Sequence, residues 1–285
     1  MDAASFVKLA ILLSVFAIVV AIGMQARPSD TLAFARYPRY ALRATLAMFV
    51  VMPLFVIFIT WALPLAPPLP AALIALAVSP MPPILPRKEA KTGGQMDYVI
   101  SLQVFATVVS LIAAPLFIAV AGWLFDVKVA YSPGNVFMTL LLTVAIPLAA
   151  GIAFGRFWPA AAARLAGPLG RFGMAALIVA CLGLLVAVGP RMLEKVGSGV
   201  LLTAILIVVV ALAVGHALGG PSEGNRGALA VATAARHPGV AIGMGTTYYP
   251  LDQGAVIAVV LIYVLVSVLV SIPYVRWRSR LIARA

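Results

Sequence analysis

The feature of this sequence that most constrains its fold is a series of nine long apolar runs separated by short polar segments. A hydrocarbon core about 30 Å thick is crossed by a helix of roughly 20 apolar residues. Only 10% of the residues are charged, whereas about a quarter are charged in a soluble domain. The runs are too long and too continuous for the alternating strands of a membrane β-barrel. The sequence therefore predicts an all-α polytopic membrane protein.

The nine runs fill the chain, so residues 1–285 are predicted to form one transmembrane domain with no separate soluble part. The runs lie at about 4–24, 39–63, 69–97, 98–125, 134–156, 169–189, 198–219, 224–247 and 252–277. We interpret the first run as a retained helix, because no convincing small-residue cleavage site of a signal peptide follows it.

The residue types and spacings that enzymes use for catalysis are not evident in this sequence. Cys181 is the only cysteine, which excludes a disulfide framework and a cysteine-based metal site. No metal-ligand spacing, Ser–His–Asp set or phosphate-binding loop stands out, so neither a metal nor a cofactor is predicted. His216, at the end of the seventh run, is interpreted as an interfacial structural residue.

The net charge of +12 predicts a membrane orientation rather than nucleic-acid binding, because the arginines sit at the ends of the runs. Cytoplasmic loops are enriched in basic residues. With nine crossings, three basic clusters fall on one side, which predicts a cytoplasmic C-terminus and an outer N-terminus in a cell (inner) membrane. The clusters are Arg27, Arg36, Arg39 and Arg43; Arg156, Arg164 and Arg171; and Arg276, Arg278, Arg280 and Arg284.

The third and eighth runs are interrupted near their middles. The third, 69–97, contains Pro86 within "MPPILPRKEAKTGG", and the eighth, 224–247, is broken at Pro238 and Gly239. A pair of interrupted apolar segments in corresponding positions of two halves is a sequence sign of an inverted-repeat transporter. Broken helices are tolerated in a membrane where they are buried in protein or line a water-filled cavity. Two crossing discontinuous helices are therefore predicted around a central site.

Charged and titratable residues accompany both breaks. Ionisable groups within a membrane cost free energy and favour a functional hypothesis. Alternatives stay open: residues 87–91 could form an ordinary cytoplasmic loop, and Arg236 could pair structurally with Glu89 or Asp97. His237 is equally compatible with a hydrogen-bonded structural role and with a proton carrier. The candidate ion- or substrate-binding residues at the breaks are Lys88, Glu89, Lys91, Thr233, Arg236 and His237.

Several motifs, in order along nearly the whole chain, resemble the bile acid:sodium symporter family. "GMQARPSD" is similar to that family's Gly-Met-Gly…Pro-x-Asp turn, and "FVVMPL" to its Gln-Phe-x-x-Met-Pro segment. "VVSLIAAPLFIAV" and "IPLAAGIAFGRFWP" resemble two further family helices. "ARHPGVAIG" resembles the second crossing motif, Glu-x-Gly-Met-Gln-Asn-x-Gly-Leu-Ala.

The resemblance implies a panel domain and a core domain, with two broken helices crossing in the core and the substrate beside the crossing. It also implies transport of organic anions, such as bile acids, steroid sulfates or small carboxylates, usually with sodium. The nine runs fit the nine-helix form of the family.

The sodium ligands implied by the family are largely replaced in this chain. Ala232 stands where the family has its sodium-binding glutamate, Arg236 where it has glutamine and His237 where it has asparagine. "PILPRKEA" replaces the first crossing motif, which puts Glu89 and Ala90 at its Ser-Asn pair.

The helix that follows the first crossing motif keeps part of the family pattern. Thr107 matches a sodium-ligand threonine, and Gln103 replaces a serine. Sodium requires a shell of oxygen ligands, and losing the carboxylate and amides removes most of that shell. Sodium coupling is therefore predicted to be lost.

The leading functional hypothesis is a secondary or facilitative transporter of a small organic anion across the bilayer. Arg236, with Lys88 or Lys91, would stand in for the bound cation or would bind the anion bidentately. One alternative is a proton-coupled symporter that uses His237 and Glu89. Another alternative is a membrane receptor or scaffold that does not transport.

Overall fold

The computed structural model describes residues 3–26, 34, 37–63, 65, 69–79, 81–82, 91–124, 133–195, 199–248 and 250–283, and within these ranges it is helical and contains no strand. The helices of the first half are α1 (Ala3–Gln25), α3 (Pro38–Thr45), the π-helical segment η1 (Leu46–Val51), α4 (Met52–Ala62), α5 (Leu69–Val78) and α7 (Met96–Leu124). The second half has α8 (Pro133–Leu140), the π-helical segment η2 (Leu141–Ala145), α9 (Ile146–Phe157), α10 (Pro159–Lys195), α11 (Leu201–Leu218), α12 (Glu223–Ala234), α13 (Pro238–Tyr248), the 3-10 turn η4 (Pro250–Asp252) and α14 (Gln253–Ile282).

The lengths of these helices confirm an all-α polytopic membrane protein. Within the described ranges, five helical stretches are long and apolar enough to cross a bilayer. They are Pro38–Ala62, Met96–Phe117, Pro159–Ala180, Leu201–Leu218 and Gln253–Ile282.

Two boundaries differ from the sequence prediction. Helix α7 already begins at Met96, within the range assigned to the third run. Helix α10 extends beyond the predicted run 169–189 at both ends, because Pro168 and Pro190 lie inside one continuous helix rather than at its limits.

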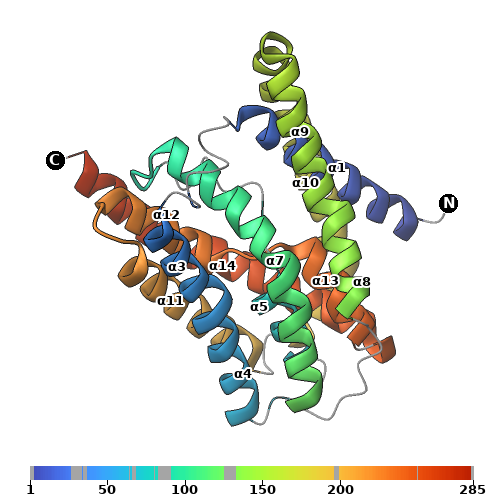
Figure 1. The fold of residues 1–285 in the computed structure, drawn as a ribbon. Helices are drawn as coiled ribbons and strands as arrows, with labels where there is room; N and C mark the ends of the chain where they lie inside the picture. Colours follow the sequence, from blue (N-terminus) through green and yellow to red (C-terminus); the bar gives the residue numbers. More distant parts are fainter. Residues whose placement is uncertain are drawn as a thin grey trace.

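The helices form two groups, which we call the panel and the core (Figure 1). The panel contains α1, α8, α9 and α10, with α1 packed along both α9 and α10. The core contains the remaining helices, and its α14 runs through the centre of the molecule (Figure 1). The two groups touch where α10 packs on α14 and where α7 packs on α8.

Small residues hold the panel helices close together. A Cβ added at Gly23 of α1 would overlap Leu148 O of α9, and one added at Gly151 would overlap Val20 O. Close approach of small residues is the usual way in which helices pack inside a membrane.

A proline follows both η1 and η2 at the second position of the next helix. Pro53 follows η1 and Pro147 follows η2. Proline has no N–H and its ring crowds the preceding turn, and a π-helical turn accommodates the ring by widening that turn. In η1 the widened turn brings backbone oxygen atoms to the centre of the core.

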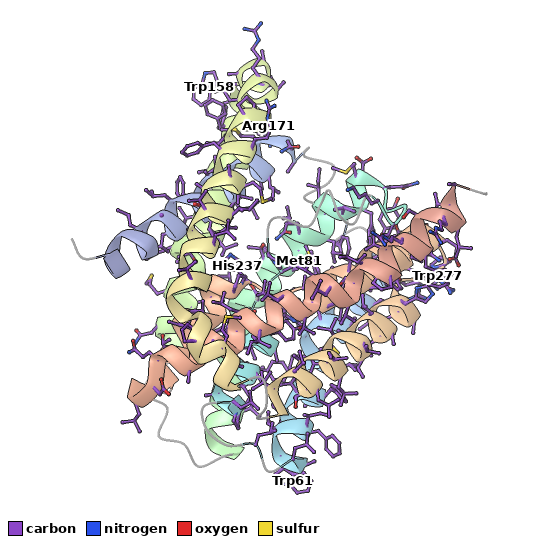
Figure 2. All side chains as sticks on the ribbon, turned by 180° about the vertical axis from the view of Figure 1, so that it is seen from behind. Trp61, Met81, Trp158, Arg171, His237 and Trp277 are labelled. Carbon is purple, nitrogen blue, oxygen red and sulfur yellow. The ribbon has the colours of Figure 1, made fainter. Side chains whose placement is uncertain are left out.

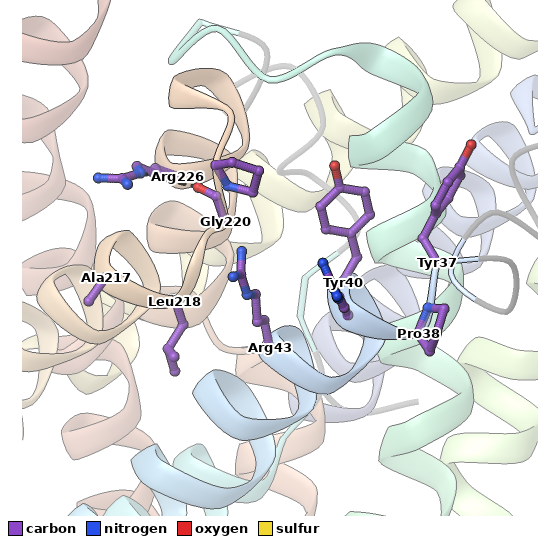
Figure 3. Close-up of a pocket in the computed structure, with 10 residues that line it drawn as sticks. Tyr37, Pro38, Tyr40, Arg43, Ala217, Leu218, Gly220 and Arg226 are labelled. Atoms are coloured by element: carbon purple, nitrogen blue, oxygen red, sulfur yellow. Dashed lines mark hydrogen bonds between the residues drawn. The ribbon is translucent and has the colours of Figure 1, made fainter.

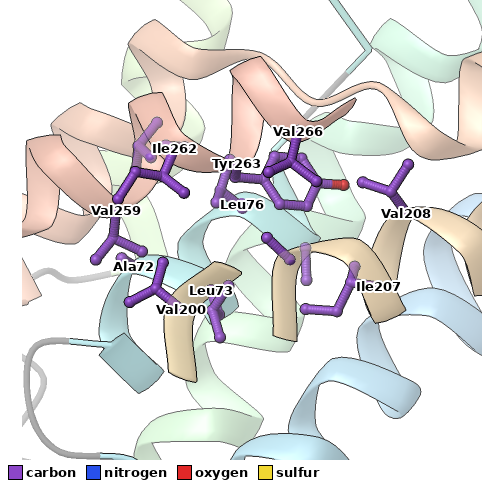
Figure 4. Packing of buried hydrophobic residues seen from close by; sticks show 14 of the residues in the cluster. Ala72, Leu73, Leu76, Val200, Ile207, Val208, Val259, Ile262, Tyr263 and Val266 are labelled. Carbon is purple, nitrogen blue, oxygen red and sulfur yellow. The ribbon is translucent and has the colours of Figure 1, made fainter. Parts of the chain in front are cut away.

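The core is closed by apolar side chains from α5, α11 and α14 (Figure 4). Its central members include Ala72, Leu73, Leu76, Ile207, Val208, Val259, Ile262, Tyr263 and Val266. Figure 2 shows His237 and Met81 in the middle of the molecule, whereas Trp61, Trp158 and Trp277 lie towards its ends. The described residues at the two breaks, Ser79, Met81, Arg236 and His237, are therefore buried inside protein, as broken membrane helices require.

Candidate functional site

The second break separates α12 from α13 at Ala235, Arg236 and His237. Helix α12 ends at Ala234, and Ala235 is extended with φ −95° and ψ 137°. Pro238 is the first residue of α13. A proline disfavours helical backbone at the residue before it but suits the first position of a new helix. The sequence Arg-His-Pro-Gly thus interrupts the helix and immediately starts the next one.

The first break begins where α5 ends at Val78. Ser79 is fully buried, and its hydroxyl donates to Leu76 O at 2.8 Å. Met81 is also fully buried, and its carbonyl accepts from Gln103 Nε2 of α7 at 3.4 Å. Side chains from elsewhere in the core therefore bind the backbone of this break.

Arg236 connects the two breaks. Its side chain is only 4% exposed. The Nη1 atom donates to Ser79 O at 3.4 Å, and Nη2 donates to Met48 O of η1 at 3.2 Å. One guanidinium thus joins the end of α5, the π-helical segment η1 and the break after α12.

Prolines follow both accepting carbonyls in the sequence, five residues after Met48 and four after Ser79. In π-helical register Met48 O would accept from residue 53, which is Pro53 and has no N–H. In α-helical register Ser79 O would accept from residue 83, which is also a proline. Buried carbonyl groups are almost always hydrogen-bonded, and Arg236 provides the donors.

The last carbonyl of α12 is held by α14. Tyr263 Oη donates to Ala234 O at 3.0 Å, and Ser267 Oγ donates to the same oxygen at 3.1 Å. Both side chains are buried. These bonds fix the end of α12 two residues before Arg236.

The electrostatics of the crossing favour a cation at Arg236. The C-terminal ends of α5 and α12 point to it, and each helix end carries a partial charge of about −0.5. In the described part of the chain, no carboxylate forms an ion pair with Arg236, and Glu223 pairs with Arg226 and Arg278. Asp97, one predicted partner of Arg236, is exposed at the start of α7.

One small cavity lies beside Arg236 among the residues that the structure describes. A cavity of about 10 Å³ is lined by Arg236, Tyr263, Leu76, Ile207 and other core residues. A single water requires at least about 10–15 Å³ by this kind of measure. The cavity in this conformation is therefore too small for an organic anion at the guanidinium.

His237 caps the start of α13. It is 4% exposed, and its Nδ1 accepts from Val240 N–H at 3.4 Å. The proton of the neutral ring is then on Nε2, and this atom has no hydrogen-bond partner within the described ranges. The ring is both a structural cap and a buried donor available to a ligand.

The predicted residues of α7 lie near the first break. Gln103 is 2% exposed, and its Oε1 has no hydrogen-bond partner among the residues that the structure describes. Thr107 is equally buried, and its hydroxyl donates to Gln103 O at 2.9 Å. Gln103 thus contacts the break directly, and Thr107 lies one turn further along the helix.

Thr233 and Lys91 are not brought together with Arg236. The Thr233 hydroxyl donates to Leu229 O at 2.7 Å and lies against Gly215 of α11. Lys91 is exposed in a turn, and the nearby Gly93 packs on Gly224 at the start of α12. The 12-residue α12 separates this turn from Arg236, at about 1.5 Å per residue.

The remaining predicted residues, Pro86, Lys88 and Glu89, lie outside the described residues. Pro238 and Gly239 begin α13 as expected of a helix break. The residues whose carbonyl groups accept from Arg236, Met48 and Ser79, were not singled out by the sequence. The prolines at positions 53 and 83 were the one sequence signal that could have pointed to the two carbonyls.

A comparison with known families places most of the chain in one of them. Residues 11–218 match the family described as the sodium bile acid symporter family. This range contains α5, η1 and α7, and so includes the first break. A comparison with curated proteins gave no significant match.

Proposed function

The chain belongs to the sodium bile acid symporter family, and from this we propose that it transports a small organic anion without sodium as the coupling ion. In this proposal Arg236 provides a permanent positive charge where the family resemblance implies a bound cation. The core moves against the panel around the crossing, as in alternating access by rocking bundles. Basic residues at the helix ends favour a cytoplasmic C-terminus.

The observation that carries the proposal is the pair of bonds from Arg236 to Met48 O and Ser79 O. Carbonyl oxygens are ligands that hard cations take in proteins. Each of the two helix C-termini carries a partial charge of about −0.5, which favours a cation beside them. A sodium ion at the same place would compete with a cation that never dissociates.

The same contacts favour the cation role of Arg236 over direct binding of the anion. Nη1 and Nη2 already donate to carbonyl groups, and the adjoining cavity has a volume of only about 10 Å³. We propose instead that the anion approaches the N-terminal end of α13. Helix N-termini favour negative groups, and among the described residues His237 Nε2 has no hydrogen-bond partner there.

Replacement of sodium tests this function directly. We expect proteoliposomes to take up at least one radiolabelled probe, from a bile acid, a steroid sulfate and a short-chain carboxylate, equally well in sodium and in choline buffer. Stimulation by sodium of tenfold or more, corresponding to about 1.4 kcal/mol, contradicts a built-in cation. Absence of flux for every probe, relative to protein-free liposomes, favours the receptor or scaffold alternative.

Proton coupling is tested with a pH jump. We expect no transient accumulation of a steroid sulfate when the outside is acidified, because protonated His237 would place a second positive charge beside Arg236. A sulfate probe is used because it stays ionised over the range of the jump. Protonation of Nδ1 would also break the bond from Val240 N–H.

His237→Asn is the matched variant for this experiment. Asparagine is a good helix N-cap, so the start of α13 is retained while the titratable ring is removed. We expect the pH profile of uptake to be the same in the variant and in the wild type. A pH-driven overshoot that His237→Asn abolishes would establish the proton-coupled alternative.

A further inference from the structure

A large cavity lies away from the crossing, between the start of α3 and the end of α11 (Figure 3). Its volume is about 750 Å³, within the size range of small-molecule sites. The charged residues that line it are Arg39, Arg43 and Arg226. Among the described lining residues, the charged ones are these three arginines and none is acidic.

Two of these arginines have no partner of their own. Within the described ranges, Arg39 and Arg43 form no hydrogen bond and no ion pair. Gly220 has φ +86°, and a Cβ there would lie 2.6 Å from Arg43 Nη1. Glycine tolerates this backbone conformation and also leaves the room that the guanidinium occupies.

The third arginine is held in place but only partly neutralised. Arg226 Nε donates to Gly220 O at 3.1 Å and lies 3.7 Å from Glu223 Oε1. Glu223 is engaged more closely by Arg278, whose Nη1 donates to Oε2 at 2.8 Å. That hydrogen bond holds the pKa of the Glu223 carboxyl below its usual value. The negative charge of Glu223 therefore mainly neutralises Arg278 and not Arg226.

Aromatic side chains complete the wall. Tyr40 packs on Tyr37 and Tyr98, with ring centroids 5.8 and 5.7 Å apart, and Tyr37 and Tyr40 both line the cavity. Tyrosines at the ends of membrane helices typically lie at the level of the lipid headgroups. The cavity opens where α3 begins and α11 ends, which is where a lipid headgroup would lie.

We propose that this cavity binds a phosphate group, carried by an anionic phospholipid of the surrounding membrane. Arginine matches phosphate oxygens through paired N–H donors, and basic pockets between membrane helices bind anionic headgroups. Arg39 and Arg43 contribute guanidinium groups from α3, and Arg226 contributes one from α12. The bound headgroup links α3 to α12, whose far end leads to Arg236.

The test measures binding of defined lipids to the purified protein in detergent by native mass spectrometry. We expect phosphatidylglycerol to bind and phosphatidylcholine not to compete with it. The Arg39→Gln/Arg43→Gln/Arg226→Gln variant should bind phosphatidylglycerol about a hundredfold more weakly, since each arginine contributes roughly 1 kcal/mol. Arg39→Gln/Arg43→Gln, which leaves α12 unchanged, should show about a thirtyfold loss.

The matched control is Arg156→Gln/Arg164→Gln/Arg171→Gln, which removes the same charge from exposed positions of the panel. An equal loss in this control would show general attraction to the protein and would overturn the proposal. Equal binding of phosphatidylcholine would also overturn it. In a second experiment, inorganic phosphate or glycerol phosphate competes with phosphatidylglycerol for binding. Full displacement of the lipid by either compound at equal concentration would overturn the assignment to a lipid.

Discussion

Replacing Arg236 with methionine is expected to lower the free energy of unfolding by about 3–5 kcal/mol and to abolish uptake. Methionine keeps an unbranched apolar side chain but has no donor. The buried Met48 O and Ser79 O would lose their charge-assisted bonds, each worth about 1.5–3 kcal/mol. Thermal unfolding in detergent and flux in proteoliposomes measure the two effects. Arg164→Met, at an exposed position, is the control, because it should change neither the thermal stability nor the flux by much.

The same variant tests why the loss occurs. If Arg236 replaces a bound cation, the empty position in Arg236→Met should attract sodium through the freed carbonyl groups. Sodium, compared with choline, should then raise the melting temperature of the variant and leave that of the wild type unchanged, because a ligand stabilises only a state that binds it. A variant with wild-type stability, or with uptake intact, would contradict the central role of this side chain.

Replacing Gly215 with leucine is expected to separate α11 from α12 and to prevent accumulation of folded protein. A Cβ at Gly215 would lie 2.5 Å from Ala230 Cα, 2.7 Å from Leu229 O and 2.8 Å from Thr233 Oγ1. Two of these atoms belong to the backbone, which cannot move aside by a rotamer change. Overpacking costs about 1–3 kcal/mol where side chains can adjust, so a clash with the backbone should cost more.

Gly183→Leu is the matched control for this effect. Gly183 lies inside α10, is exposed, and has no neighbouring atom within 4 Å of an added Cβ. Yield of monodisperse protein and melting temperature should fall sharply for Gly215→Leu and remain near wild type for Gly183→Leu. Equal behaviour of the two variants would mean that the close contact of α11 with α12 does not determine folding.

The sequence was sufficient to predict the membrane-spanning class and the position of the second break. Apolar runs of helical length leave few folds open in lipid, and Arg-His-Pro-Gly within such a run interrupts a helix by local stereochemistry alone. Both effects act over a few residues. The ends of α10 were predicted less well. Its internal prolines locally suggested helix boundaries, whereas the structure has one continuous helix there.

The partners of Arg236 could not be predicted because they are remote in the chain. Ser79 and Met48 lie 157 and 188 residues away from it. The partner first expected for a guanidinium in a membrane is also a carboxylate rather than a backbone carbonyl. The prediction that Lys91 belongs with Arg236 relied on both residues being near a break. The structure instead puts Lys91 in a turn near the start of α12, where Gly93 packs on Gly224.

The fixed guanidinium at the crossing also bears on membrane voltage. A carrier that brings sodium with its substrate cancels the charge of an organic anion, but a carrier with a permanent cation moves one net negative charge for each monovalent anion transported. A membrane potential contributes about 2.3 kcal/mol per elementary charge for every 100 mV. In a cell whose interior is negative by about 100 mV, the equilibrium concentration of a monovalent anion is then roughly fiftyfold higher outside than inside. A transporter built around Arg236 would therefore export a monovalent anion unless another gradient opposed the voltage.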